Sequence, residues 1–202
     1  MPRMAHPPLR ADGKIEVVVT SLEMLEPPEG PAIPAPRDGL DIEQAVHPTV
    51  SFYRYLYDTI GEDWLWSDRR RLDDAALAAI LHHPAVEVFV LWVHGVPAGY
   101  AELDGRVEGE VELAYLGLIP DFIGQKLGPY LLDWAIHTAW ARDPRRLWVH
   151  TCTLDHHAAL DFYQRSGFKP YARMVEIADD PRAIGLVPRS FAPHVPIIEP
   201  GA

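Results

Sequence analysis

The chain has 202 residues, with 29 acidic and 18 basic side chains and a formal net charge of −11 at pH 7. This length predicts one domain with a buried core. The negative charge argues against nucleic acid and anionic membrane surfaces as partners, and no apolar run is long enough to span a membrane. The single cysteine, Cys152, excludes an internal disulfide and a multi-cysteine zinc site and is typical of a reducing compartment, so we expect a cytoplasmic protein.

The 20 prolines of the chain gather toward its two ends. Residues 1–48 are therefore expected to form a strand and a proline-rich loop packed on the body. Residues 49–177 are expected to form the folded domain, and residues 178–202 a proline-rich tail laid on the body or trailing from it.

Hydrophobic periodicity and turn residues predict alternating strands and helices. In chain order they are a strand over 14–25, an extended loop over 25–39, helices over 49–61 and 71–83, strands over 86–95, 96–105 and 109–120, a helix over 128–141, a strand over 146–154, a helix over 156–167 and a strand over 168–177. Thr49 is a candidate N-cap of the first helix. This order predicts an α/β protein with a mixed, mostly antiparallel central sheet and helices on its faces.

The junction between strand 109–120 and helix 128–141 carries a loop with two glycines, Gly124 and Gly128. A strand that feeds such a loop into a helix N-terminus turns several unpaired backbone N–H groups toward one point, at the positive end of the helix dipole. That geometry binds phosphate without a basic side chain, which suits an anionic cofactor in an acidic chain. The alternative is that the two glycines only permit a tight turn.

The loop Ile123-Gly124-Gln125-Lys126-Leu127-Gly128 resembles the Q/R-x-x-G-x-G/A loop of the GNAT superfamily of acyl-CoA-dependent N-acetyltransferases, whose backbone amides hold the pyrophosphate of CoA. Ile123 stands where the family has glutamine or arginine, and Lys126 stands in place of its middle glycine. Pro129 removes an amide that often helps to bind the phosphate in the family. The resemblance covers residues 49–177.

Residues 156–168 resemble a second family motif, N-x-x-A-x-x-x-Y-x-x-x-G-F, with His156 in place of the usual asparagine. Ala159, Tyr163, Gly167 and Phe168 match its other defined positions. The resemblance implies that Tyr163 lies beside the thioester sulfur and protonates the departing thiolate, which suits a phenol with an ordinary pKa of about 10. The alternative is that Tyr163 is a core aromatic residue. Asp155 is a second candidate for the N-cap of this helix.

Transfer to an amine also needs a base, because an ammonium group is not a nucleophile. Period-two alternation places Glu110, Glu112 and Ala114 on one face of strand 109–120, and Val111, Leu113 and Tyr115 on the other. Burial would raise the pKa of a carboxylate there toward the useful range. Glu112, whose spacing from Leu118 resembles that of the family's catalytic glutamate, is the predicted base, acting directly or through a water. The alternative is that one or both glutamates face solvent.

The resemblance implies acetyl-CoA as the co-substrate and assigns further residues to its binding. The predicted cofactor-binding residues are Leu116, Gly117, Leu118, Ile123, Gly124, Gln125, Lys126, Leu127, Gly128 and His156. The candidate acceptor-binding residues are Tyr53, Trp64, Trp66, Glu102 and Glu110, although the three aromatic residues equally suit a core. No metal site is expected, because the histidine pairs His82-His83 and His156-His157 lack metal-ligand spacing.

The predicted function is direct transfer of an acetyl group from acetyl-CoA to a primary amine of a small molecule or a protein. The acidic strand residues favour a cationic amine as the acceptor. The alternative is a CoA-binding sensor or regulatory module of the same fold, and a third interpretation is a domain whose glycine loop is only a turn. Cys152 is expected to be a buried, inert thiol rather than an acyl carrier. No nucleic acid or membrane partner is expected, and a homodimer is compatible with the sequence.

Overall fold

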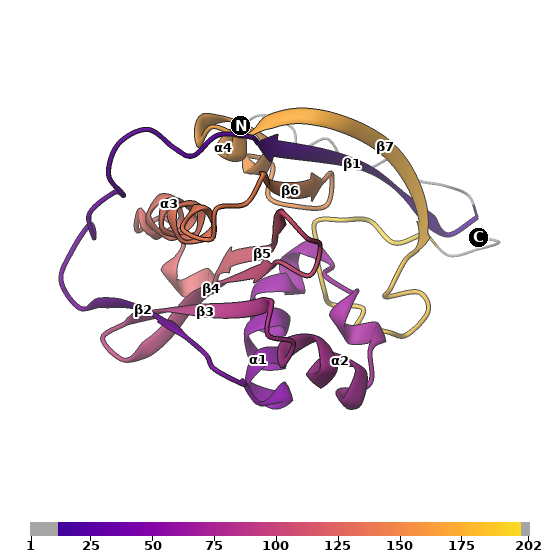
Figure 1. Ribbon diagram of the computed structural model, residues 1–202. Coiled ribbons are helices and arrows are strands. Elements are labelled where there is room, and N and C mark those ends of the chain that lie inside the picture. Colours follow the sequence, from indigo (N-terminus) through magenta and orange to yellow (C-terminus); the bar gives the residue numbers. More distant parts are fainter. Residues whose placement is uncertain (1–11, 199–202) are drawn as a thin grey trace.

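The computed structural model describes residues 12–198, which form a mixed α/β fold around a seven-stranded sheet (Figure 1). The strands are β1 (Lys14–Met24), β2 (Leu40–Gln44), β3 (Val86–Val93), β4 (Val96–Asp104), β5 (Glu110–Leu118), β6 (Arg146–Cys152) and β7 (Lys169–Asp179). The helices are α1 (Val50–Gly61), α2 (Asp74–Leu81), α3 (Leu127–Trp140) and α4 (Ala159–Arg165), with short 3-10 turns at Glu62–Trp64, Arg69–Arg71 and Pro120–Phe122. The predicted fold class is confirmed.

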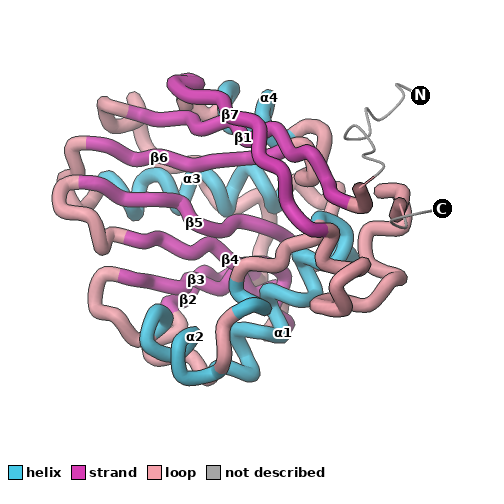
Figure 2. The backbone as a smooth tube through the Cα atoms, turned by 90° about the vertical axis from the view of Figure 1, so that its right-hand side faces the viewer, coloured by secondary structure: helices cyan, strands magenta, loops and turns pink. Residues whose placement is uncertain are grey.

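The strands follow the spatial order β2-β3-β4-β5-β6-β1-β7, which Figure 2 shows from one edge of the sheet to the other. Among the described strands every neighbouring pair is antiparallel except β5 and β6, which run parallel. The sheet is therefore mixed and mostly antiparallel, as predicted.

Helices cover both faces of the sheet. On one face, Leu131 of α3 packs with Leu91 in a core that α4 also joins. On the other face, Leu56 of α1 and Leu77 of α2 pack with Val90 in a second core. Because β3 sends neighbouring residues into both cores, it is apolar along its length instead of alternating between apolar and polar residues.

The helix ends differ in how well the sequence predicts them. Thr49 caps α1 as expected, with Oγ1 accepting a hydrogen bond of 3.3 Å from the backbone N–H of Phe52. Helix α4 begins at Ala159, later than predicted, and Ala158 is its N-cap. Asp155 does not cap it, because the Asp155 carboxylate is held by Thr151 and by the backbone N–H of Cys152.

The N-terminal segment is part of the sheet rather than a layer on it. The predicted first strand exists as β1, but it lies between β6 and β7. Strand β2, which the sequence analysis missed, forms the opposite edge beside β3. The proline-rich loop between them passes along α3 (Figure 1), where the backbone N–H of Ile33 donates to Asp133 at 2.7 Å.

The C-terminal segment is packed onto the body. Arg182 is 2% exposed, forms an ion pair of 2.8 Å with Asp180, and donates to the backbone carbonyls of Phe191, Ala192 and Val195. The apolar residues of this segment join Ile15 and other residues of β1 in a third core. This folded tail brings residues near 194 to the end of the sheet where the candidate site lies.

A β-bulge changes the predicted faces of β5. Glu102 of β4 is opposite Tyr115 but Leu103 is opposite Leu113, which leaves Ala114 as the extra residue. Leu113 therefore joins the α3 core while Tyr115 packs in the α1 core. The expectation that Leu113 and Tyr115 share a face is wrong, because strict alternation fails at a bulge.

Candidate active site

The two parallel strands β5 and β6 diverge, and a cavity opens between them. They pair only where Glu110–Glu112 lie beside Arg146–Trp148. From Leu113 to Leu118, β5 still pairs with β4 but has no strand partner on its other side among the described residues. The cavity has a volume of about 640 Å³ and is lined by residues from both diverging strands. Backbone polar groups along such an open edge are available to a bound molecule.

Gly117 of β5 allows α1 to pack closely against the sheet. A Cβ atom added there would collide with the side chain of Ile60 on α1. On the next strand, a Cβ at Gly99 would lie 2.5 Å from the carbonyl oxygen of Gly117. Glycine at 117 is therefore required by packing, independently of any ligand.

The loop before α3 forms one end of the cavity. Gly124 has a φ of +82° and Lys126 a φ of +62°, so both are left-handed. Lys126 is the N-cap of α3 and no side chain caps this helix, which leaves its first backbone N–H groups available. Lys126 thus adopts the conformation that a glycine takes most easily at this position.

Most of the predicted cofactor-binding residues line this cavity. They are Leu116, Gly117, Leu118, Ile123, Gly124, Lys126, Leu127, Gly128 and His156. Gln125 is not among the lining residues, and its side-chain amide donates to the carbonyl of Asp121 at 2.9 Å. Burial, together with the neighbouring His157, lowers the pKa of His156.

Tyr163 of α4 also lines the cavity. It is 8% exposed, and its ring lies edge-on to that of Phe168 at 5.9 Å between centroids. Its hydroxyl makes no hydrogen bond with any residue that the structure describes. Burial raises the pKa of Tyr163 above its ordinary value, so the phenol keeps its proton at neutral pH. It can donate that proton to a base beside it.

Glu112 and His150 form a pair across the point where the strands diverge. The Nδ1 atom of His150 lies 3.2 Å from Oε1 of Glu112. His150 lines the cavity, whereas Glu112 does not. The hydrogen bond to Glu112 raises the pKa of His150. The sequence analysis missed His150 as a site residue, because its partner lies on another strand and nothing in the local pattern marks it.

Two of the predicted acceptor-binding residues, Tyr53 and Glu102, are buried away from the cavity. Glu102 is 0% exposed and accepts hydrogen bonds of 2.5 Å from both Tyr53 and Arg69. Burial raises the pKa of Glu102, and the charge of Arg69 opposes that rise. Direct contact of either residue with an acceptor is therefore not supported. Glu102 instead bonds Tyr53 on α1 and Arg69 in the segment that follows α1.

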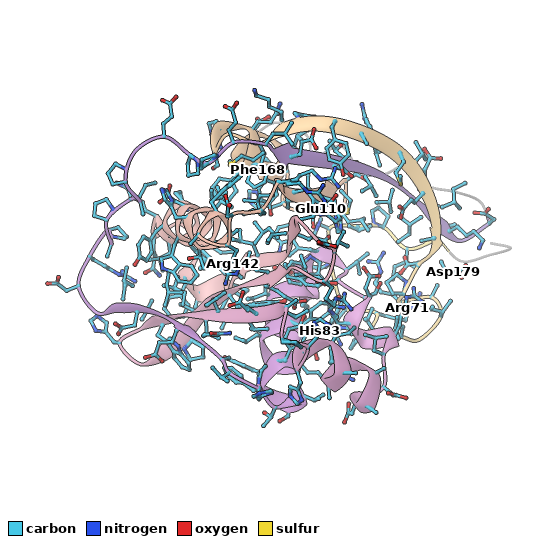
Figure 3. The ribbon with its side chains drawn as sticks, in the orientation of Figure 1. Arg71, His83, Glu110, Arg142, Phe168 and Asp179 are labelled. Atoms are coloured by element: carbon cyan, nitrogen blue, oxygen red, sulfur yellow. The ribbon has the colours of Figure 1, made fainter. Side chains whose placement is uncertain are left out.

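Glu110 is placed at the first residue of β5 (Figure 3), where it forms an ion pair of 2.6 Å with Arg146. It does not line the cavity. Each of the three strand glutamates that favoured a cationic acceptor thus has a basic partner: Arg69 for Glu102, Arg146 for Glu110 and His150 for Glu112.

The segment after α1 forms an aromatic wall of the cavity. Trp64 and Trp66, two of the candidate acceptor-binding residues, line it, and Trp66 packs on Tyr115 at 5.1 Å between ring centroids. Asp68, which the sequence analysis missed, also lines the cavity. Its side chain makes no hydrogen bond or ion pair with any described residue, and its charge acts on His150.

Cys152 lines the cavity as well, but it is poorly suited to nucleophilic chemistry. Burial raises the pKa of its thiol to about 12, so the reactive thiolate is scarce at neutral pH. Residues 12–198 contain no cluster of side chains that could hold a metal ion. No helix among them is long and apolar enough to cross a membrane.

The family model of the acetyltransferase (GNAT) family matches residues 51–168. A GCN5-related N-acetyltransferase from Kribbella flavida has 20% identity and a TM-score of 0.53, and the match covers 83% of this chain and 60% of that one. A functionally unknown conserved protein from Staphylococcus epidermidis has 17% identity and a TM-score of 0.57, with 83% of this chain and 63% of that one covered.

An aminoglycoside acetyltransferase from an uncultured soil metagenomic sample, solved with trehalose, has 17% identity and a TM-score of 0.52, with 64% of this chain and 88% of that one covered. At these identities the solved structures support the fold alone. The match spans about 60% of the length of the Staphylococcus and Kribbella structures. No curated protein sequence matches the chain. The family model spans more than half of the chain, which therefore belongs to the GNAT family of acetyltransferases.

Proposed function

We propose that this protein transfers an acetyl group from acetyl-CoA directly to a primary amine. One observation carries the proposal: a single cavity joins the open edge of β5, the uncapped N-terminus of α3 and the buried phenol of Tyr163. These three features suit three parts of an acyl-CoA, namely its amide-containing arm, its pyrophosphate and its thioester.

The residues present fit acetyl-CoA. Unpaired backbone groups of β5 between Leu113 and Leu118 suit the amides of the pantetheine arm. Backbone N–H groups at the start of α3 suit the pyrophosphate, and Lys126 adds a positive charge beside them. We call these backbone N–H groups the phosphate cradle. Pro129 contributes no N–H, so the cradle has one donor fewer than a helix N-terminus without a proline.

Attack by a neutral amine then needs one proton removed and one proton supplied, and an amine that enters as ammonium must first lose its extra proton. The amine nitrogen attacks the thioester carbonyl carbon, the carbon–sulfur bond breaks, and the nitrogen loses a proton. We assign that proton to His150, whose imidazole faces the cavity while Glu112 holds its other nitrogen. The predicted base Glu112 thus acts through His150 rather than by contact with the amine.

Tyr163 supplies the second proton to the departing thiolate. Burial raises the pKa of its phenol, and the same burial makes a thiolate formed beside it more basic, so the transfer remains feasible. Cys152 keeps its thiol proton and takes no acyl group, because its pKa is also raised by burial.

Release of free thiol from acetyl-CoA in the presence of an amine panel tests this function. Amine-dependent release that Tyr163→Phe reduces supports it. A second candidate, a CoA-binding module without catalysis, is favoured by the missing amide at Pro129. It predicts a thermal shift with CoA but no thiol release with any amine.

A further inference from the structure

A second cavity, of about 630 Å³, adjoins the first one at the same end of the sheet. It lies over β1, the end of β6 and the start of β7, and the folded C-terminal segment closes part of it. The two cavities share a wall formed by Trp64, Cys152, Leu154, Asp155 and His156. The two cavities are therefore immediate neighbours.

The charged side chains that line the second cavity are one arginine, Arg173, and one aspartate, Asp155, and three histidines lie with them. Arg173 of β7 is exposed at its lining, and its side chain makes no ion pair or hydrogen bond with any described residue. His157 and His194 lie there too, from the loop before α4 and from the C-terminal segment. The acidic lining residue is Asp155, whose Oδ2 already accepts hydrogen bonds from Thr151 and from the backbone of Cys152.

Aromatic rings hold part of this lining in place. The ring of Trp64 lies 5.4 Å from that of His156 and 5.9 Å from that of His194, both roughly edge-on. The C-terminal segment that carries His194 is fixed by the buried ion pair of Arg182. Three separate parts of the chain, β7, the loop before α4 and the C-terminal segment, thus line this one chamber.

This chamber is separate from the proposed phosphate cradle. Gly124, Lys126 and Gly128 line the first cavity and not the second. The proposed pyrophosphate site lies at the start of α3, so that group does not need the guanidinium of Arg173, which is available to another anion. Glu102 and Glu110 are paired with arginines, and none of the three glutamates of β4 and β5 lines the first cavity, so none of them is placed to hold a cationic acceptor.

The charge that remains unpaired suits a molecule with charges of both signs. In the first cavity, Asp68 is an unpaired carboxylate whose charge reaches His150, and it suits the ammonium form of the reacting amine. In the second, Arg173 suits an anionic group of the same molecule.

We propose that the second cavity binds an anionic group of the acceptor, so that the acceptor is a small amine that also carries a carboxylate or a phosphate. This inference rests on the proposed acetyl transfer and names the substrate class of the same site. The reacting nitrogen lies beside His150, and the anionic group pairs with Arg173.

The test compares matched amines in steady-state assays of thiol release. Amino acids are compared with their own carboxamides and with the amines left when the carboxyl group is removed, and O-phosphoethanolamine is compared with ethanolamine. We expect kcat/KM to be about tenfold or more higher for the anionic members. The carboxylate and phosphate arms show which of the two anions is preferred.

Variants then assign the preference to Arg173. Arg173→Gln should raise the KM of the anionic acceptors about tenfold, leave kcat and the KM of acetyl-CoA nearly unchanged, and leave uncharged amines unaffected. Arg173→Lys should retain part of the preference. Arg37→Gln is the matched control. It should behave as wild type, because Arg37 is exposed beside β2 at the opposite edge of the sheet.

Equal or better turnover of the uncharged amines would overturn this inference and leave the proposed acetyl transfer standing. A rise in the KM of acetyl-CoA in Arg173→Gln would also overturn it, because the second cavity would then belong to the cofactor. Thiol release with neither series would overturn the proposed function itself, and this inference with it.

Discussion

Of the paired residues Glu112 and His150, 3.2 Å apart, only His150 lines the cavity between β5 and β6. The carboxylate therefore lies behind the imidazole as seen from a bound molecule. Glu112 accepts from Nδ1 and leaves the other ring nitrogen as the proton acceptor, the tautomer that a general base requires.

This pair predicts a pH profile. The hydrogen bond to Glu112, with the charges of Asp155 and Asp68, raises the pKa of His150, and the reaction needs the neutral imidazole. Activity should therefore rise with pH through this raised pKa. Glu112→Gln removes the main cause of the rise, so the acid limb of the kcat profile should move to lower pH.

His150→Gln should remove that limb and reduce kcat by about 10²-fold or more. Both profiles are measured as kcat against pH at saturating acetyl-CoA. If Glu112 were the base in direct contact with the amine, His150→Gln would retain most of the activity and Glu112→Gln would lose it, which is the opposite ranking.

Tyr163→Phe should separate catalysis from folding. The hydroxyl has no hydrogen-bond partner among the described residues, so its removal should change the thermal midpoint little. Loss of the proton donor should reduce kcat by roughly 10²-fold with little effect on the KM of acetyl-CoA. Gln164→Ala, a change on α4 at an exposed residue that does not line the cavity, is the comparison variant. An unchanged kcat in Tyr163→Phe would remove this residue from the mechanism.

The ion pair between Arg69 and Glu102 should support the aromatic wall from inside the protein. Glu102→Gln leaves the Arg69 charge without its buried partner and should lower the free energy of unfolding by about 3–5 kcal/mol. Tyr53→Phe removes one hydrogen bond to a charged group and should cost about 1.5–3 kcal/mol. Urea unfolding measures both. Wild-type stability in Glu102→Gln would contradict the buried pair.

Pro129 tests the geometry of the phosphate cradle. Pro129→Ala restores a backbone N–H in the first turn of α3 and should tighten CoA binding severalfold by calorimetry. Lys126→Gly keeps the left-handed turn but removes the positive charge, and it should weaken CoA binding severalfold. Dephospho-CoA and pantetheine serve as ligand controls, since pantetheine lacks the pyrophosphate and should not distinguish the variants.

The sequence was sufficient to predict the strands and helices around the site, because turn glycines, prolines and hydrophobic periodicity mark them locally. The loop at Gly124 was also found this way, whereas the motif containing Tyr163 was identified from the family resemblance, and both line one cavity. Local signals predict which residues lie at element ends, and the family resemblance predicts which of those ends meet.

Features that depend on contacts between distant segments could not be predicted. The position of β1 between β6 and β7 depends on strand order, which no local pattern encodes. The bulge at Ala114 reversed the face of Tyr115, and the burial of Glu102 depends on Arg69, which lies 33 positions earlier. His150 and Asp68 could be identified as site residues only from the folded structure, in which both line the same cavity.

The most direct test of the proposed acetyl transfer is the rate of thiol release from acetyl-CoA, measured with and without amines for wild type and Tyr163→Phe. The account predicts amine-dependent release by wild type, with acetylated amine formed in equal amount, and a reduction of roughly 10²-fold in Tyr163→Phe. Tight CoA binding with no amine-dependent release from any amine, or equal rates in the two proteins, would contradict it.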